Sequence, residues 1–204
     1  MILWRFVNSF EPLTYWFLIE NARENDVFLD IGAHIGIYTV RLAKRVSKVI
    51  ALEPEPKNYN LLRRNIIINR VNDKTVALPI AASNVDGYTY LCVKRGSGAH
   101  TLEDLRNCIK KVKLVTLRMD TLLRILDIEK VDIVKIYVEG HENKVVSGMR
   151  EILRYSPPRV LVIEIRRKSL NLLKYFVKKG YRVRVLDHVG SAYNCGFTLR
   201  KTEG

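Results

Sequence analysis

A glycine-containing loop between two apolar segments constrains this chain more than any other feature. The run 27–31, apolar apart from Asp30, leads into the loop Gly32-Ala33-His34-Ile35-Gly36, and a second apolar run, 49–52, ends at Glu53. Glycines allow the backbone to approach a ligand where a Cβ atom would clash, and an acid about 20 residues further on can bind ribose hydroxyls. The pattern predicts a strand, a nucleoside-binding loop, a helix and a second strand.

The glycine spacing indicates which nucleoside the loop binds. Dinucleotide sites use Gly-x-Gly-x-x-Gly so that a pyrophosphate contacts bare amides. In this chain His34 replaces the second glycine of that pattern. Asp30, directly before the loop, disfavours a polyanion and favours a ligand with positive charge, such as the amino and sulfonium groups of S-adenosylmethionine. The alternative is an ordinary loop of an α/β fold that binds nothing.

Length and composition predict one domain over residues 1–204, with a helical segment at 1–24 and the core at 25–204. The chain has 204 residues and is 48% hydrophobic, enough for a full core. Residues 1–20 are rich in apolar and aromatic side chains, but Arg5 and Glu11 interrupt them well before the roughly 20 residues that span a bilayer. We expect a helix packed on the domain and no transmembrane segment, and the alternative is a short interfacial anchor.

The charge balance leaves two interpretations open. The 35 Lys and Arg residues exceed the 21 Asp and Glu residues and give a formal charge of +14. Such a field attracts nucleic acid, anionic lipid or phosphorylated sugars. The alternative is a solvated basic surface without a partner, because the basic clusters are spread along the chain.

The cysteines and histidines predict neither a disulfide framework nor a metal site. Cys92, Cys108 and Cys195 are far apart and odd in number, and no C-x-x-C pattern occurs. The four histidines lack the spacing of metal ligands on one helix. This usage fits a reducing cytoplasm.

Hydrophobic periodicity predicts alternating strands and helices. The expected strands are 26–31, 48–53, 75–81, 88–93, 112–117, 132–138, 159–165, 181–187 and 194–199, and the expected helices are 10–23, 35–46, 56–69, 119–127, 142–154 and 168–179. This alternation predicts a doubly wound, mostly parallel α/β sheet with a C-terminal antiparallel hairpin. Ligands of such sheets bind beyond the carboxyl ends of the strands, where Asp30, Glu53, Ala81, Ala82, Ser83, Tyr137, Glu139 and Glu164 are expected.

Three blocks of sequence resemble the FkbM family of S-adenosylmethionine-dependent methyltransferases: Asp30 to Thr39, Leu52 to Pro56, and Lys135-Ile-Tyr-Val-Glu-Gly-His-Glu142. The first block is shared by many class I methyltransferases, and the third is far more specific. The resemblance implies the seven-stranded, Rossmann-like methyltransferase fold and transfer of a methyl group, usually to an oxygen of a sugar or other small metabolite.

One residue departs from the family pattern, which usually reads Lys-Ile-Asp-Val-Glu-Gly and here has Tyr137 in place of the aspartate. The aspartate is the natural candidate for a general base, whereas a phenol with a pKa near 10 is a poor base at neutral pH. Tyr137 can still orient an acceptor, and Glu139, Glu142 or His141 can replace the base. Equally, Glu139 and Glu142 are acids that stabilise the N-terminus of a helix.

The expected site residues fall into three groups. The cofactor-binding residues are Asp30, Gly32, Ala33, His34, Gly36, Tyr38, Glu53, Pro54, Ala81, Ala82 and Ser83; the catalytic residues are Tyr137, Glu139 and Glu142; and the acceptor-binding residues are His100, Thr101, His141 and Glu164. The alternatives are an exposed loop residue for His34 and a surface turn for His100 and Thr101.

The expected function is therefore S-adenosylmethionine-dependent O-methylation of a glycan or small-molecule acceptor. An RNA methyltransferase is the main alternative, because the chain is basic and its first half also resembles archaeal tRNA guanine methyltransferases. No separate RNA-binding domain supports it. The second alternative is a cofactor-binding protein in which Tyr137 has abolished turnover.

Overall fold

The main sheet of the protein has seven strands, as the sequence predicts. A computed structural model describes residues 11–94, 100–103 and 105–200. The strands are β1 (Val27–Ile31), β2 (Lys48–Leu52), β3 (Thr75–Leu78), β7 (Ile133–Ile136), β8 (Val160–Ile165), β9 (Tyr181–Val189) and β10 (Ala192–Leu199). Their order is β3-β2-β1-β7-β8-β10-β9. The first five are parallel, and β10 is antiparallel to both of its neighbours, which confirms the doubly wound sheet with a C-terminal hairpin.

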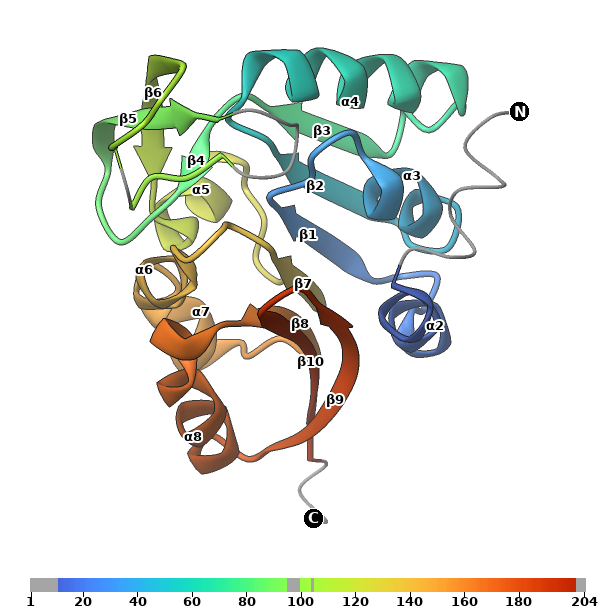
Figure 1. Ribbon diagram of the computed structural model, residues 1–204. Coiled ribbons are helices and arrows are strands. Elements are labelled where there is room, and N and C mark those ends of the chain that lie inside the picture. The colour runs from blue at the N-terminus through green and yellow to red at the C-terminus, as the bar shows by residue number, and fades with distance from the viewer. Residues whose placement is uncertain (1–10, 95–99, 104, 201–204) are drawn as a thin grey trace.

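Helices cover both faces of this sheet (Figure 1). They are α2 (Pro12–Asn21), α3 (Ile37–Ala43) and α4 (Pro56–Ile68) on one face, and α5 (Met119–Ile125), α6 (Glu142–Ser147), α7 (Arg150–Tyr155) and α8 (Asn171–Lys178) on the other. Residues 1–10 of the predicted N-terminal segment lie outside the described residues.

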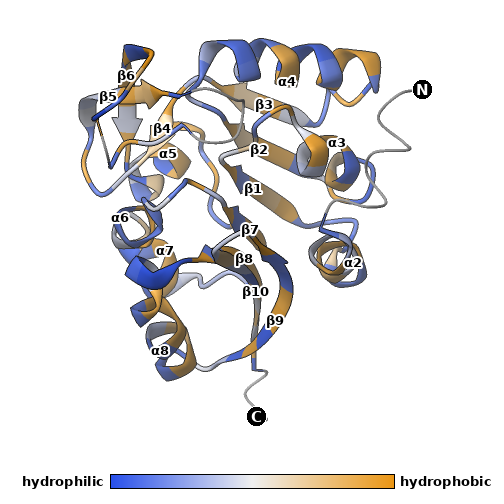
Figure 2. Ribbon diagram, in the orientation of Figure 1, coloured by the Kyte–Doolittle hydropathy of each residue, from blue (hydrophilic) through white to orange (hydrophobic). Residues whose placement is uncertain are grey.

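Alternation along the central strands explains why they are almost continuously apolar. Phe28 and Ile133 pack in the hydrophobic cluster with α2, α3 and α4, whereas Leu29 and Val134 pack in the cluster with α5 to α8. Successive side chains of a strand point to opposite faces, so a strand covered on both faces needs apolar residues at both. Figure 2 shows the resulting hydrophobic colour along β1 and β2.

The predicted strands at 88–93 and 112–117 form a second sheet. Here β4 (Ala81–Ala82), β5 (Gly87–Val93) and β6 (Lys110–Leu117) are arranged in the order β4-β6-β5. The predicted strand at 75–81 is thus divided between the two sheets. This small sheet lies beside the carboxyl ends of the main strands (Figure 1), where Ala81, Ala82 and Leu91 line a cavity.

The predicted helix at 142–154 is interrupted between α6 and α7. The Asp120 carboxylate accepts hydrogen bonds from the backbone N–H groups of Glu151 and Ile152, both at 3.1 Å, and thereby starts a new helix. At the break, a Cβ atom on Gly148 would collide with the carbonyl oxygen of Ser83. The hydrophobic periodicity of the segment carries no information on the close packing at this glycine or on capping by a distant aspartate. The sequence therefore did not predict the break.

The expectation that the cysteines are unpaired is wrong for two of them. Cys92 at the end of β5 and Cys108 form a disulfide, with their Cα atoms 5.2 Å apart. The chain turns back after β5 and returns as the antiparallel β6, which brings together two cysteines 16 residues apart. Cys195 is a buried free thiol. The cysteines therefore no longer favour a reducing compartment.

The helix α2 is fixed to the other end of the described chain. The Asp187 carboxylate on β9 accepts hydrogen bonds from the backbone N–H groups of Leu13, at 3.3 Å, and Thr14, at 2.7 Å. Phe17 packs against Gly196 of β10, where a Cβ atom would collide with its ring. None of the helices in the described ranges is both long and apolar enough to cross a membrane.

Candidate active site

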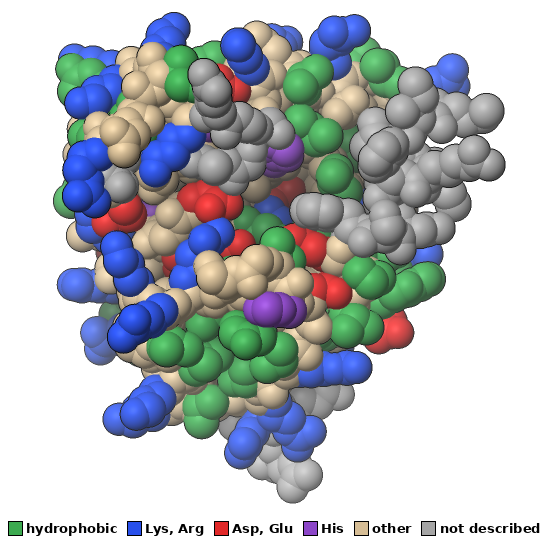
Figure 3. Space-filling model, viewed as in Figure 1, with side chains coloured by type: hydrophobic (Ala, Val, Ile, Leu, Met, Phe, Trp, Pro, Cys, Tyr) green, Lys and Arg blue, Asp and Glu red, His purple; other side chains and the backbone are tan. Residues whose placement is uncertain are grey.

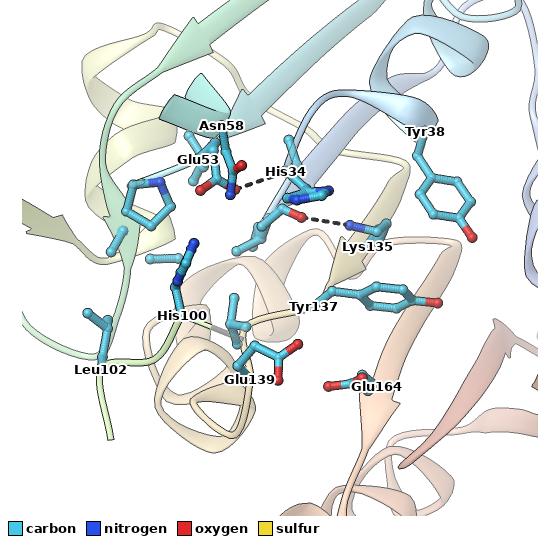
Figure 4. A pocket seen from close by; sticks show the side chains of 18 of the residues that line it. His34, Tyr38, Glu53, Asn58, His100, Leu102, Lys135, Tyr137, Glu139 and Glu164 are labelled. Atoms are coloured by element: carbon cyan, nitrogen blue, oxygen red, sulfur yellow. Dashed lines mark hydrogen bonds between the residues drawn. The ribbon is translucent and has the colours of Figure 1, made fainter. Parts of the chain in front are cut away.

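A cavity of about 430 Å³ opens at the carboxyl ends of β1, β2, β7 and β8, with the small sheet on one side. Twelve of the predicted site residues line it: Gly32, Ala33, His34, Tyr38, Glu53, Pro54, Ala81, Ala82, His100, Tyr137, Glu139 and Glu164. Figure 4 shows their arrangement. Six predicted residues lie outside this lining: Asp30, Gly36, Ser83, Thr101, His141 and Glu142.

The loop after β1 needs both of its glycines. Gly32 has a φ of 76°, and a Cβ atom there would collide with the carbonyl oxygen of Tyr137 at the end of β7. Gly36 has a φ of 89° and packs against the Leu62 side chain of α4. Both values lie in the left-handed region that favours glycine. Gly32 therefore lets the loop approach β7 beside the cavity, whereas Gly36 joins the loop to α3.

Glu53 is held ready at the end of β2. One carboxylate oxygen accepts a 2.8 Å hydrogen bond from the backbone N–H of His34, and the other accepts a 2.9 Å bond from that of Glu55. Only 6% of the residue is exposed, and burial raises the pKa of its carboxyl to about 7, although the two N–H groups act in the opposite direction. The side chain thus has a fixed direction toward the cavity (Figure 4).

Asp30 lies beneath the cavity. Its carboxylate accepts a 2.6 Å hydrogen bond from Thr39 and a 2.9 Å hydrogen bond from the Nζ atom of Lys135. Lys135 also donates to the Gly32 carbonyl oxygen at 3.0 Å, and it lines the cavity itself. The strand register pairs Asp30 with Lys135 across β1 and β7, which is the signal that could have identified this lysine from the two motifs.

Two tyrosine rings lie next to the Lys135 ammonium. Its Nζ atom is 4.3 Å from the ring centroid of Tyr137 and 5.3 Å from that of Tyr38, and the two rings meet edge to face. The Tyr38 hydroxyl donates a 2.6 Å hydrogen bond to Glu11. Burial raises the pKa of Tyr137 well above its usual value, so its hydroxyl is not a base near neutral pH.

Glu139 and Glu164 line the cavity on the side away from Glu53, and Arg166 joins them (Figure 4). Arg166 donates a 2.7 Å hydrogen bond to Glu139 and another of 2.7 Å to Glu164. Burial and the neighbouring Glu164 raise the pKa of Glu139 to about 7, while Arg166 acts in the opposite direction. Glu142, the first residue of α6, is fully buried and accepts a 3.0 Å hydrogen bond from the backbone N–H of Gly140, which precedes the helix.

The remaining predicted acceptor residues hold a segment of the cavity wall. The His141 ring contacts the Ser83 hydroxyl through Nε2 at 3.0 Å and the Glu103 carboxylate through Nδ1. The Thr101 hydroxyl donates to the Glu139 carbonyl oxygen at 3.1 Å. These bonds attach residues 100–103 to the start of α6, and His100 and Leu102 of that segment face the cavity.

Sequence reasoning missed three polar residues of the lining: Glu11, Asn58 and Lys135. Asn58 lies in the first turn of α4, where Glu55 caps its backbone N–H at 2.8 Å. Asn65 of the same helix donates a 2.7 Å hydrogen bond to the Ile35 carbonyl oxygen and supports the glycine loop. Glu11 precedes α2 and reaches the cavity only because that helix packs across the sheet edge.

The charge of the cavity is opposite to that of the whole chain. Among the described lining residues, four are glutamates (Glu11, Glu53, Glu139 and Glu164) and one is a lysine. Figure 3 shows acidic side chains in the hollow of this face, and the basic side chains are mainly around its periphery. The arrangement suits a ligand that carries positive charge or many hydroxyl groups.

The sheet order, the terminal hairpin and a cavity at the strand ends define the fold of class I methyltransferases. The sequence matches the model of the family described as the methyltransferase FkbM domain over residues 30–183. The chain belongs to this family.

The chain is also similar to named methyltransferases. The chain is 28% identical over 139 residues to hexuronic acid methyltransferase AglP of Haloferax volcanii, covering 67% of this chain and 55% of that protein. A shorter match, over 36% of the chain, is 32% identical to a tRNA (guanine(37)-N(1))-methyltransferase of Phytophthora infestans and covers 17% of it. This chain thus spans little more than half the length of AglP.

Solved structures show the same fold. The FkbM methyltransferase of Methylobacillus flagellatus aligns with a TM-score of 0.61 and 16% identity, over 85% of this chain and 43% of that chain. The Streptococcus mutans protein SMU.1697c in complex with SAH aligns with a TM-score of 0.57 and 12% identity, over 92% of this chain and 96% of that chain.

Proposed function

We propose that this protein transfers a methyl group from S-adenosylmethionine to a hydroxyl oxygen of an uncharged sugar or other small molecule. The observation that carries the proposal is the Glu53 carboxylate. It is fixed by two backbone N–H groups at the end of β2 and faces a cavity beside the Gly32 loop. A carboxylate so placed accepts hydrogen bonds from the two hydroxyls of a ribose.

The residues present fit this cofactor. Ala81, Ala82 and Leu91 give the cavity an apolar wall for a purine, and the volume lies within the range of ordinary ligand sites. S-adenosylmethionine, when bound, supplies an electrophilic methyl group. Its sulfonium charge is compatible with the acidic lining, whereas a dinucleotide would bring a pyrophosphate into it.

The acceptor lies, in this proposal, at the edge formed by Glu139 and Glu164, which Arg166 joins. Carboxylates and a guanidinium held in one network can orient hydroxyl groups by hydrogen bonds. Glu139, whose pKa burial raises to about 7, can take the hydroxyl proton as the oxygen is methylated. Displacement at a methyl group depends mainly on alignment, so one weak base suffices.

The charge pattern also separates the proposal from its alternatives. An RNA acceptor would use the basic periphery, but its phosphates would approach four lining glutamates. In a protein without turnover, Glu139 would serve only as the structural partner of Arg166.

The test incubates the purified protein with methyl-labelled S-adenosylmethionine and a cell extract, which is then separated into carbohydrate, small-metabolite, lipid and RNA fractions. We expect label in the carbohydrate or small-metabolite fraction, and its loss with Glu139→Gln. Glu129→Gln, an exposed acid outside the cavity, is the matched control. Label that enters RNA, or none in any fraction although the cofactor binds, would contradict the proposal.

A further inference from the structure

We propose that Glu11 binds the ammonium group of the methionine part of S-adenosylmethionine, and that Lys135 faces the carboxylate of the same part. This inference rests on the proposed function. It assigns to Glu11, which belongs to no predicted motif, the contact that the sequence suggested for Asp30.

The first step is that Asp30 is already satisfied. Its carboxylate accepts from Thr39 and Lys135, the residue is fully buried, and it does not line the cavity. A ligand ammonium could reach it only by displacing Lys135, which would leave a second buried charge without its partner. The recognition of a positive ligand group therefore has to come from another carboxylate.

The second step is the position of Glu11. Glu11 is only 8% exposed and lines the cavity, and its carboxylate accepts the 2.6 Å hydrogen bond from the Tyr38 hydroxyl. Figure 4 places Tyr38 on one side of Lys135 and Glu53 on the other, so the Tyr38 and Glu11 side of the cavity lies away from the ribose carboxylate. This is the direction in which a methionine chain attached to the ribose would extend.

The third step is that Glu11 is fixed in place. Its backbone has a φ of 50°, in the left-handed region, and its carbonyl oxygen accepts from Tyr15 in the first turn of α2. Asp187 of β9 accepts hydrogen bonds from the backbone N–H groups of Leu13 and Thr14 in the first turn of α2. Val189 of the same strand also lines the cavity. A residue held in such a strained conformation by two elements points to a binding role.

The fourth step is complementarity of charge. The amino acid end of the cofactor is a zwitterion, and this end of the cavity carries one carboxylate and one ammonium, Glu11 and Lys135. Asp30 and the Gly32 carbonyl oxygen accept from Lys135, which leaves one of its three N–H groups for a ligand carboxylate. The rings of Tyr38 and Tyr137 limit the access of water to both charges.

The test measures binding of three ligands by calorimetry at pH 8. S-adenosylhomocysteine has both charged groups, S-adenosyl-3-thiopropylamine keeps only the ammonium, and 5′-methylthioadenosine has neither. We expect Glu11→Gln to weaken the first two ligands at least tenfold and to leave the third within about twofold, as a charge-assisted hydrogen bond requires. Glu20→Gln, an exposed acid on α2, should change none of them.

The outcomes separate the inference from the function on which it rests. If the wild type binds none of the three ligands, the proposed function fails and the inference with it. If the wild type binds all three and Glu11→Gln weakens them equally, Glu11 only supports the structure and the inference is wrong. Unchanged binding of S-adenosylhomocysteine by Glu11→Gln would also overturn it. Tyr38→Phe, which keeps the carboxylate but removes its donor, should weaken the two ammonium ligands by a smaller factor.

Discussion

Lys135 donates a 2.9 Å hydrogen bond to Asp30 from the neighbouring strand, and both side chains are almost completely buried. The pair joins β1 to β7 directly beneath the cavity, and the loop that begins at Gly32 is tied to the same ammonium. One buried ion pair therefore both joins the two central strands and supports the candidate site from below.

Replacing Lys135 with methionine should destabilise the protein by about 3 to 5 kcal/mol, because it leaves the Asp30 carboxylate buried without its cation. Urea unfolding followed by circular dichroism measures the change. The double variant Asp30→Asn, Lys135→Met should recover a large part of the loss, since it removes both charges. A single variant as stable as the wild type would show that the pair is not energetically coupled.

Glu53 should make the stability of the ligand-free protein depend on pH. Burial raises its pKa from 4.5 to about 7, so the folded state holds a proton more tightly than the unfolded state. The stability that the protonated Glu53 carboxyl contributes is fully present below pH 4.5 and is lost as the pH rises through 7. The wild type should therefore lose stability relative to Glu53→Gln between pH 5 and pH 8. The difference in their free energies of unfolding should change by up to about 3 kcal/mol in favour of the variant.

Urea titrations at both pH values measure this difference for Glu53. The exposed Glu24→Gln variant should show none of it. A difference that stays constant with pH would mean that Glu53 titrates normally in the folded chain.

Tyr137→Phe should keep most of the methyl transfer, with a loss of about tenfold or less. Phenylalanine retains the aromatic ring that lies next to the Lys135 ammonium, and the Tyr137 hydroxyl has too high a pKa to act as a base. Glu139→Gln should lower the rate of methyl transfer by the factor of roughly 10² to 10⁴ that a general base contributes. Label transfer at saturating cofactor measures both rates. If Tyr137→Phe loses as much as Glu139→Gln, the hydroxyl takes part in the chemistry.

Reduction of the Cys92–Cys108 disulfide should lower the free energy of unfolding by about 3 kcal/mol, the value expected for a loop of this length. It should also weaken cofactor binding, because His100 and Leu102 lie inside the closed loop and line the cavity. Unfolding and binding with and without dithiothreitol measure both effects. The variant Cys92→Ser, Cys108→Ser should already show the reduced values and should not respond to the reagent.

The sequence predicted the features that short-range patterns determine. Apolar runs such as 27–31 and 159–165 marked strands buried on both faces, and acids after those runs marked the ligand-binding edge. Glu53 and Glu139 could be placed in this way, because the end of a parallel strand has a known place in the sheet.

Contacts between distant segments were beyond these patterns. Asp30 follows the same rule as Glu53, but Lys135 turns its carboxylate away from the cavity. Glu11 has no motif around it, and only the packing of α2 on β9 brings it to the site. Cys92 meets Cys108 because of the antiparallel return of β6, which spacing alone does not specify.

The attachment of α2 to Asp187 sets an order for making the protein. A ribosome releases the glycine loop, β2 and β7 long before β9, and until β9 emerges the first turn of α2 lacks its two hydrogen bonds to Asp187. The backbone next to Glu11 is therefore tied to the sheet only after β9 has been made. On the role proposed for Glu11, the ammonium-binding side of the site is the last part to be fixed as the chain is made.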